Sequence, residues 1–503
     1  MSRLSKNIIY NLFGQGLLLI LGFVAVKYIF KQLGEDALGI IYFTLTMNAV
    51  LCAVLEMGIC STTVREVSAH FNDEPKYIQN FIQTASLFYW TAYLLLAVII
   101  YFVAPILINK WINLKTMDAA AATQVLRILG ISALLALPRS LYASLFRGLQ
   151  RMEFNLIDVA SSTLQQFGII VILAIGGGLL SVAYWLVVSF GIGVLCYLLA
   201  ASRFFSWQAF IPHYFPAVVR RNIGYSSNMM SISLLAMVHT QSDKIIVSKL
   251  LPVGLFGFYG FAYSAVSKAT LLTSAVAQAA FPSFSSLFKM GGRDIMMSQY
   301  RKLQDLLCFG TVPIFGVIPF AVLPVFGFVF NPDVARMLLL PVTLLALGFY
   351  MNGALNVPYV FSLAVGKPEI SSKSNFLALF IVLPVTGALI YFFGLNGAGF
   401  SWVFYHIFAY SYAVPRICSE CLGIPVREWY LHIFKILVLT ILTYGLGWAF
   451  LELMGYYSIF SLVLAYTGAT IVFLTCAYFM INDELKNTLL QFSKALRIRR
   501  VEI

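Results

Sequence analysis

Long apolar stretches recur along this chain, and they restrict its fold more than any other feature. Each is about 20 residues long, the length that a helix needs to cross the hydrocarbon core of a bilayer. The bilayer interior offers no water to backbone N–H and C=O groups, so such stretches must form helices. With 60% hydrophobic and 11% charged residues, the composition lies far outside the soluble range. The sequence therefore predicts an all-α polytopic membrane protein.

Fourteen stretches qualify as transmembrane helices, with boundary errors of several residues. The first follows a short basic segment and lacks a small-residue cleavage site, so we expect it to remain as a helix. The predicted spans are residues 8–30, 38–60, 81–104, 123–146, 155–176, 179–201, 223–249, 253–278, 303–330, 336–363, 374–394, 397–416, 431–453 and 457–480.

The order of apolar stretches and turns repeats once along the chain. At a constant shift of 218 residues, Gly39 meets Gly257 and Phe43 meets Phe261. Chance predicts about 1.4 glycine coincidences over the overlap. The register contains at least four, because these pairs also coincide: Gly130 with Gly348, Gly148 with Gly366, and Gly176 with Gly394. The pattern indicates a duplicated membrane bundle.

The charged residues of the loops predict the orientation. With the N-terminus in the cytoplasm, 23 of the 33 Lys and Arg residues lie on the cytoplasmic side and six on the outer side. The positive-inside rule therefore places both termini in the cytoplasm. Because each repeat has six helices, an even number, the two repeats are parallel.

These observations predict a domain organisation of four parts. An N-terminal six-helix lobe covers residues 1–202, and a cytoplasmic linker covers residues 203–222. A second six-helix lobe covers residues 223–418. Helices 13 and 14, with a basic cytoplasmic tail, make up residues 419–503.

Sequence motifs typical of nucleotide-binding proteins, serine hydrolases and metalloenzymes are not found. There is no Walker A loop, GxSxG elbow or HExxH pair, and Cys418 and Cys421 form a lone CxxC. The net charge of +13 falls in short loops, which suits membrane topology better than a nucleic-acid surface. We therefore expect no enzymatic activity, no cofactor, no metal and no nucleic-acid partner.

Charged residues inside predicted spans are candidates for function, because each costs about 2.5–3.5 kcal/mol on insertion scales. Arg139 and Lys268 lie deep in their predicted helices, and Arg139 follows a kink predicted at Pro138. Cations at such depth suit a phosphate group. Two alternatives stay open: Arg139 pairs with a neighbouring helix, or Lys268 extends toward the cytoplasmic surface.

Three carboxylates are candidates for ion coupling. Glu56 and Asp158 fit proton or cation binding, because a buried carboxylate can have a raised pKa, and the alternative is a solvated or paired side chain. Asp243 is adjacent to Lys244, so the two cannot share one helix face and each needs another partner. A packing ion pair is the leading interpretation of Asp243 and Lys244.

Polar residues, all uncharged except Glu56, recur at helical spacing in four predicted helices, which are two repeat-equivalent pairs. These stripes predict a central polar cleft between two lobes, although small polar residues also join helices to one another. The stripes comprise Asn7, Asn11 and Gln15; Thr44, Asn48, Cys52 and Glu56; Asn228, Ser231, His239 and Ser242; and Tyr263, Ser267, Thr270, Ser274 and Gln278.

Several short motifs resemble those of a known family, and each keeps its order and spacing. They are Leu33 to Gly39, Leu55 to Gly58 leading to Val64 to Glu66, Arg147 to Arg151, Asp243 to Val247, Gly257 to Tyr259, and Phe281 to Phe284. The chain resembles the polysaccharide transporter family of the multidrug/oligosaccharidyl-lipid/polysaccharide flippase superfamily. The resemblance is to bacterial O-antigen and related lipid-linked oligosaccharide flippases in particular.

The resemblance implies a MATE-like V-shaped bundle of two six-helix lobes with a cationic lumen and alternating access. It implies transfer of an undecaprenyl-diphosphate-linked oligosaccharide across the bacterial inner membrane. Two features depart from the relatives: Met57 stands where they often have an aromatic residue, and the first helix lacks the acidic residue of drug exporters. The second departure argues against cation-coupled drug export.

We therefore expect a lipid-linked oligosaccharide flippase, with H⁺ or Na⁺ and a glycan polymerase with its chain-length machinery as candidate partners. The alternatives are a cation-coupled multidrug exporter and a non-transporting scaffold of a glycan-assembly complex. The expected ion-coupling residues are Glu56, Asp158 and Asp243. The expected diphosphate- and glycan-binding residues are Arg65, Arg139, Lys268, Asn48, Ser267 and Gln278.

Overall fold

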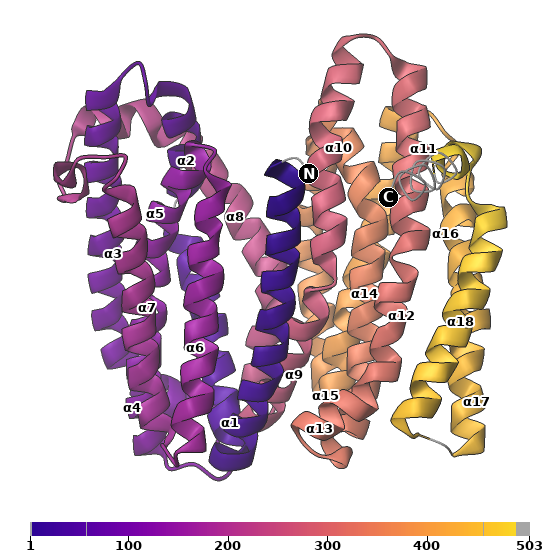
Figure 1. The fold of residues 1–503 in the computed structure, drawn as a ribbon, viewed down its shortest axis with the longest axis horizontal. Helices are drawn as coiled ribbons and strands as arrows, with labels where there is room; N and C mark the ends of the chain where they lie inside the picture. The colour runs from indigo at the N-terminus through magenta and orange to yellow at the C-terminus, as the bar shows by residue number, and fades with distance from the viewer. Residues whose placement is uncertain (1–2, 57, 456, 489–503) are drawn as a thin grey trace, which may run out of the picture. The chain divides into compact units, whose positions relative to one another are not determined.

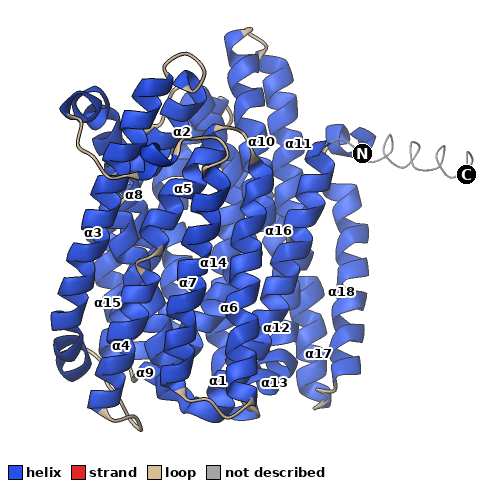
Figure 2. Cartoon of the chain, turned by 60° about the vertical axis from the view of Figure 1, so that its left-hand side comes forward, coloured by secondary structure: helices blue, strands red, loops and turns tan. Residues whose placement is uncertain are grey.

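The computed structural model describes residues 3–56, 58–455 and 457–488, and Figure 2 shows them as helices joined by short loops. Within these residues no segment is assigned to a β-strand, so the predicted all-α fold is confirmed. Packing divides the chain into two compact units, Met1–Phe261 and Ala262–Ile503. The predicted lobes follow the sequence repeat rather than these contacts, and their boundaries stay a prediction.

The first unit begins with a helix that contains two predicted spans (Figure 1). Its α-helices are α1 (Arg3–Leu55), α2 (Ile59–His70), α3 (Pro75–Lys110), α4 (Ala119–Ala133), α5 (Ala136–Gly148), α6 (Leu156–Ala174), α7 (Leu179–Ala201), α8 (Pro216–Leu250) and the first residues of α9 (Val253–Ser267). Two short 3₁₀ turns, η1 (Met152–Asn155) and η2 (Trp207–Phe210), lie in the connections.

The second unit holds the remaining helices. They are α10 (Thr270–Lys289), α11 (Arg293–Gly310), α12 (Val312–Ala321), α13 (Gly327–Val329), α14 (Pro332–Ala364), α15 (Glu369–Ile417), α16 (Val426–Thr440), α17 (Leu446–Met454) and α18 (Ile459–Met480). Three π-helical turns interrupt them: η3 (Val322–Phe326), η4 (Cys418–Leu422) and η5 (Ile441–Gly445).

Two helices contain a sharp turn at glycine. Gly34 in the 53-residue helix α1 has φ 85°, and Gly394 in the 49-residue helix α15 has φ 56°. Glycine adopts this left-handed region without the steric cost that other residues meet. Each turn marks the boundary between two predicted spans, 8–30 and 38–60 in α1 and 374–394 and 397–416 in α15.

Eleven helices of the described chain are long and apolar enough to cross a membrane. Helix α8 is not among them, although it is 35 residues long, because Asn, Ser, Gln, Asp and Lys side chains interrupt its apolar sequence. Helix α9 is apolar but shorter, and the predicted span 253–278 continues into α10. Low hydropathy in α8 is the pattern of a helix that faces protein or a polar cavity rather than lipid.

The predicted spans 123–146 and 253–278 are each divided into two helices. Helix α4 gives way to α5 at Leu134 and Leu135, as expected from Pro138, whose ring clashes with the carbonyl four residues earlier. Helix α9 ends at Ser267, and Lys268 and Ala269 form the turn before α10. The polar stripe predicted as one continuous face is therefore divided at Lys268.

The core of the first unit lies between α2, α3, α5 and α7. Leu134, Leu141 and Leu145 are fully buried there. Aromatic rings fill the remaining space, and the ring centroids of Phe146 and Phe154 stack at 4.2 Å. In the second unit α14 takes the central place, packing against α10, α11, α12 and α15.

Two glycines that the sequence repeat makes equivalent meet inside the first unit. A Cβ atom added to Gly39 would lie 2.1 Å from the carbonyl oxygen of Val253, and one added to Gly257 would lie 2.7 Å from the backbone nitrogen of Gly39. Helix α1 therefore approaches α9 backbone to backbone. The phenyl rings of Phe23 and Phe261 pack edge to face beside them, with centroids 5.0 Å apart.

The turn that follows the first span is held by a buried carboxylate. Oδ2 of Asp36, a fully buried residue, accepts hydrogen bonds from the backbone nitrogens of Lys115, Thr116 and Met117 at 2.7–3.0 Å. These bonds fix the connection between α3 and α4 against the end of the first helical hairpin.

Candidate functional site

Arg65 belongs to a closed ring of hydrogen bonds at the junction of α2, α3 and α8. Its Nη2 atom donates to Oδ1 of Asn222 at 3.0 Å, and Nδ2 of Asn222 donates to the hydroxyl of Tyr77 at 2.8 Å. The Tyr77 hydroxyl donates to Oε2 of Glu66 at 2.8 Å, and Oε1 of Glu66 accepts from Nε of Arg65 at 2.8 Å. The guanidinium also lies over the Tyr225 ring, 3.9 Å from its centroid.

This ring of bonds positions Arg65 without enclosing it. Glu66 is almost fully buried, whereas 39% of the Arg65 side chain stays exposed. A guanidinium has five N–H donors, and Nε and Nη2 account for the bonds described above. The remaining donors are available to a planar or tetrahedral anion such as phosphate.

A second cation lies next to this ring. Arg221 of α8 donates to both carboxylate oxygens of Glu74, at 3.0 and 3.3 Å, and its guanidinium lies 4.0 Å from the centroid of the Tyr77 ring. The hydrogen bond from Arg221 holds the pKa of Glu74 below its usual value. Both carboxylates near Arg65 therefore have partners.

A cavity of about 280 Å³ lies beside the Arg65 ring, between α2, α3 and α8. Asn222 lines it, as do Thr62 and Ser226, whose hydroxyl oxygens are 2.8 Å apart. The close approach of α8 depends on Gly58, where an added Cβ would lie 2.3 Å from the carbonyl oxygen of Ser226. Gly58 also has φ 65° in the position directly before α2, a conformation that glycine adopts without steric cost.

Arg139 lies in a different network. Its Nε and Nη2 atoms both donate to Oδ1 of Asp158, at 3.0 and 2.5 Å, which joins α5 to α6. The Arg139 side chain is 14% exposed and that of Asp158 is 47% exposed. The structure thus contains the inter-helix pair that sequence analysis left open, and Asp158 compensates the charge of Arg139.

Asp243 and Lys244 form a buried pair in α8. Nζ of Lys244 lies 3.4 Å from Oδ1 of Asp243, and each side chain has a further partner. Oδ2 of Asp243 accepts a hydrogen bond from the Tyr259 hydroxyl at 2.6 Å, and Lys244 donates to the carbonyl of Thr240. This arrangement agrees with the expected packing pair and its separate partners.

Glu56 differs from the other two candidate carboxylates. It lies half-buried in the turn between α1 and α2, and its backbone carbonyl accepts a 3.3 Å hydrogen bond from Tyr89. Among the residues described, no hydrogen bond or ion pair to its carboxylate is found.

The remaining candidates are spread over both units. Asn48 of α1 accepts a 3.3 Å hydrogen bond from the thiol of Cys52. Ser267 donates to the carbonyl of Ser264 at 3.0 Å, Lys268 is exposed in the turn that follows, and Gln278 is exposed on α10. Arg65 and Arg139 therefore belong to separate networks of the first unit, and Lys268 belongs to the second unit.

The polar stripes are divided between packing and exposure. Thr44 is buried and bonds within its own helix, and Tyr263 packs edge to face on Phe349 with centroids 5.3 Å apart. The side chains of Asn7, Asn11 and Asn228 lie outside the described part of the structure. The predicted cleft between the lobes stays a prediction.

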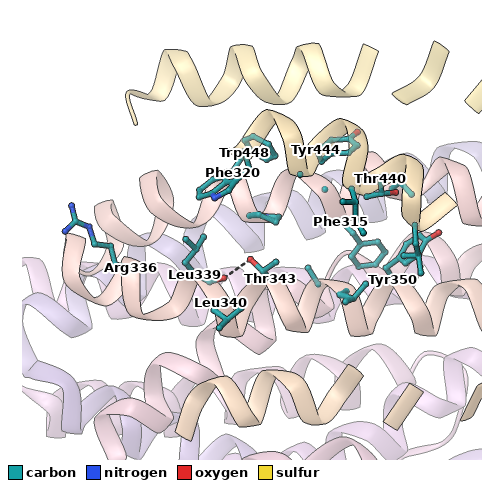
Figure 3. Close-up of a pocket in the computed structure, with 18 residues that line it drawn as sticks. Phe315, Phe320, Arg336, Leu339, Leu340, Thr343, Tyr350, Thr440, Tyr444 and Trp448 are labelled. Carbon is teal, nitrogen blue, oxygen red and sulfur yellow. Dashed lines mark hydrogen bonds between the residues drawn. The ribbon is translucent and has the colours of Figure 1, made fainter. Parts of the chain in front are cut away.

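Sequence analysis did not identify an apolar cavity in the second unit. It measures about 540 Å³ and lies between α12, α14 and the segment from α16 to α17 (Figure 3). Its lining is almost entirely apolar, and Phe315, Phe320 and Trp448 are among its aromatic side chains. Arg336 lies at one end, and the hydroxyl of Thr343 donates within its own helix to the Leu339 carbonyl at 2.7 Å.

The partners of Arg65 were also missed, because Asn222 is 157 residues away in sequence. A weak signal for the cavity did exist, since the predicted spans 303–330, 336–363 and 431–453 are mostly apolar and carry aromatic residues. In the described residues no group of three or more His, Cys, Asp and Glu side chains has a metal-binding arrangement.

These features define an α-helical polytopic membrane protein with a fold shared by solved transporters. Lipid II flippase MurJ in an inward closed conformation has a TM-score of 0.69 and 15% identity, covering 93% of this chain and 99% of that one. An inward-facing multidrug resistance MATE family transporter of the MOP superfamily has a TM-score of 0.65 and 14% identity, covering 80% and 95%.

The family described as "Polysaccharide biosynthesis protein" matches residues 4–288, more than half of the sequence. The chain belongs to this family. A Shigella flexneri protein named "Putative O-antigen transporter" is 21% identical over 422 residues, which are 82% of this chain and 98% of the relative. The expected family and the MATE-like fold are both confirmed.

Proposed function

We propose that this protein is a flippase that moves an undecaprenyl-diphosphate-linked oligosaccharide from the cytoplasmic to the outer leaflet for surface polysaccharide synthesis. The observation that carries the proposal is the 540 Å³ apolar cavity, with one cation at its end, in a chain of the polysaccharide biosynthesis family. A long hydrocarbon tail joined to an anionic group matches that lining. The O-antigen transporter relative supports the substrate class.

The proposed mechanism is non-enzymatic alternating access, with the two lobes moving as rigid bodies. The glycan occupies the polar cleft predicted between the lobes, and basic residues hold the diphosphate. Arg65 is the strongest candidate for this role, because its guanidinium is held in place on one side and exposed on the other. The orientation in the bacterial inner membrane, with both termini cytoplasmic, rests on the loop charges.

Replacing Arg65 with glutamine is expected to lower the flipping rate roughly ten- to hundredfold, because the substitution removes one or two hydrogen bonds to a charged group. Arg65→Lys should retain part of the activity, since it keeps the charge but loses the fork geometry. Flipping is measured as transfer of the labelled lipid-linked oligosaccharide in proteoliposomes. Arg151→Gln is the control, because Arg151 is an exposed cation paired with Glu153; equal losses in both variants would contradict the assignment.

Replacing Gly445 with leucine is expected to reduce flipping at least severalfold while the protein stays folded. Gly445 lines the apolar cavity, and a Cβ atom added to it would be in ordinary contact, 3.5 Å from Ile441. The longer side chain therefore occupies space where we place the hydrocarbon tail. Gly468→Leu on α18 is a matched control, because an added Cβ meets nothing within 4 Å there. Full activity of Gly445→Leu would exclude this cavity as a tail site.

Among the three carboxylates, we propose Glu56 as the ion-coupling group, because Asp158 and Asp243 already compensate cations. Transport by Glu56→Gln is expected to lose its dependence on an imposed proton or sodium gradient. A gradient dependence equal to that of the wild type would remove Glu56 from this role.

Contact with a glycan polymerase and its chain-length machinery is a further proposal, for which co-purification from the native membrane is the test.

The function itself is tested in a deletion strain whose glycan polymerase is intact. We expect the lipid-linked oligosaccharide to accumulate in the cytoplasmic leaflet and the wild-type protein to relieve the accumulation. Normal surface glycan without accumulation would overturn the flippase proposal. Increased sensitivity to toxic cationic dyes in the same strain would instead favour a drug exporter.

A further inference from the structure

A second cavity in the Ala262–Ile503 unit has a lining quite different from the apolar one. It measures about 420 Å³ and lies where α11, α16 and the end of α18 meet. Tyr300, Gln304 and Trp429 line its inner part. It therefore lies between the second lobe and the C-terminal helix pair. The proposed flipping cycle requires no role for this helix pair.

Three deeply buried side chains of this cavity each have an unsatisfied polar atom. Tyr300, Gln304 and Trp429 are 3%, 4% and 2% exposed. Within the described chain, the Tyr300 hydroxyl, Oε1 of Gln304 and Nε1 of Trp429 have no hydrogen-bond partner. The Tyr300 hydroxyl and the Trp429 nitrogen are neighbours, but their geometry does not complete a bond. Buried polar groups normally have hydrogen-bond partners, so these three atoms can donate to or accept from a ligand in the cavity.

The charged residues of this cavity are two cations and two acids besides His432, and neither cation is paired with an acid of the described residues. Arg301 and Lys435 line it, and no ion pair of either is found in the described part of the chain. Asp305 is 5% exposed and already has partners, since its Oδ1 lies 3.1 Å from Nε2 of His432 and its Oδ2 accepts a 2.7 Å bond from the backbone nitrogen of Asn482. Glu428 is the one other acid of the lining, and it is exposed.

The rim of the cavity indicates the side from which a ligand arrives. Leu431 of α16 and Met480 at the end of α18 line the cavity and are exposed. Exposed apolar side chains on membrane helices face hydrocarbon rather than water. A ligand that contacts them and the cations together needs a polar head and an apolar chain, as a membrane lipid has.

We propose that this cavity binds the headgroup of an anionic glycerophospholipid. Arg301, Lys435 and the Trp429 N–H contact the phosphate oxygens, since guanidinium and ammonium groups bind phosphate strongly. Oε1 of Gln304 accepts a hydrogen bond from a headgroup hydroxyl such as that of glycerol. Basic pockets between membrane helices bind anionic lipid headgroups in this way. The bound lipid joins α11 to α16 and α18 and is a resident of the protein, not its cargo.

The test uses the full-length protein purified in detergent and titrated with dioleoyl-phosphatidylglycerol, with dioleoyl-phosphatidylcholine as the uncharged comparison. Bound lipid is counted by native mass spectrometry. Arg301→Gln and Lys435→Gln are each expected to weaken phosphatidylglycerol binding about tenfold. Arg427→Gln removes the same charge from α16 at an exposed position outside the cavity lining and is expected to bind as the wild type does.

A second measurement does not depend on these charge variants. Phosphatidylglycerol with brominated chains is expected to quench part of the protein's tryptophan fluorescence, and Trp429→Phe should lose that part. Unchanged affinity in both charge variants, equally tight phosphatidylcholine binding, or identical quenching in Trp429→Phe would each overturn the proposal. So would saturation by soluble glycerol phosphate at the same concentration as the lipid, because the site would then serve a soluble phosphoester.

Discussion

Gly257→Ala is expected to destabilise the protein by about 2–3 kcal/mol, an overpacking cost at the high end of its usual range. The added Cβ would lie 2.7 Å from the backbone nitrogen of Gly39, closer than a Cβ atom approaches other atoms in real structures. Because the obstacle is backbone, no side-chain rotation relieves the clash, and α1 must separate from α9. Gly39→Ala should have the same effect, since its Cβ would lie 2.1 Å from the Val253 carbonyl oxygen.

The measurement is thermal unfolding of the purified protein in detergent, followed by tryptophan fluorescence. Gly22→Ala is the matched control. Gly22 lies in α1, as Gly39 does, and an added Cβ there meets nothing within 4 Å. It should be neutral or stabilising by up to about 1 kcal/mol, the difference in helix propensity between glycine and alanine. Equal unfolding temperatures for Gly257→Ala and Gly22→Ala would mean that α1 and α9 do not make this contact.

Asp158→Asn is expected to destabilise the protein by about 1–2 kcal/mol, because it leaves the mostly buried guanidinium of Arg139 without a counter-charge. The full cost of breaking a buried pair does not apply, since nearly half of the Asp158 side chain is exposed and solvent screens the change. The double variant Arg139→Gln with Asp158→Asn should recover most of the stability, because no uncompensated charge remains. Chemical unfolding of the wild type and the two variants measures these differences.

The double variant also separates the two interpretations of Arg139. If the pair only joins α5 to α6, the recovered protein should flip its substrate at nearly the wild-type rate. If Arg139 binds the diphosphate, the protein should be stable and yet flip at least tenfold more slowly. Failure of the double variant to regain stability would show that the pair does not act as an independent unit.

Much of the fold follows from local properties of the sequence. Hydropathy predicts most of the spans, because a helix is the structure in which a 20-residue segment satisfies its own backbone in a bilayer, and the low hydropathy of α8 is an exception. The glycine register also identified contact points, since Gly39 and Gly257 were paired by the repeat alone and meet in the structure. The turn at Lys268 was not predicted, because no proline or glycine marks the end of α9.

The candidate site was less accessible to sequence reasoning. Arg65, Arg139, Asp158 and Asp243 were identified because charged residues in apolar surroundings are conspicuous. Apart from Lys244 beside Asp243, their partners were not identified: Asn222 is far from Arg65 in sequence, and an asparagine near a loop carries no signal of its own. The sequence predicted which residues need partners, and packing selected the partners.

The sequence by itself determined the helical membrane fold, the parallel repeat and the family, because hydropathy, charge and motif order are properties of consecutive residues. Only the tertiary structure decided that Arg139 is compensated by Asp158, that Arg65 is held open to solvent, and that two cavities flank the C-terminal helix pair. The physical reason is that a compensated charge and an enclosed volume depend on the separation of side chains from different helices. That separation is set when the helices pack.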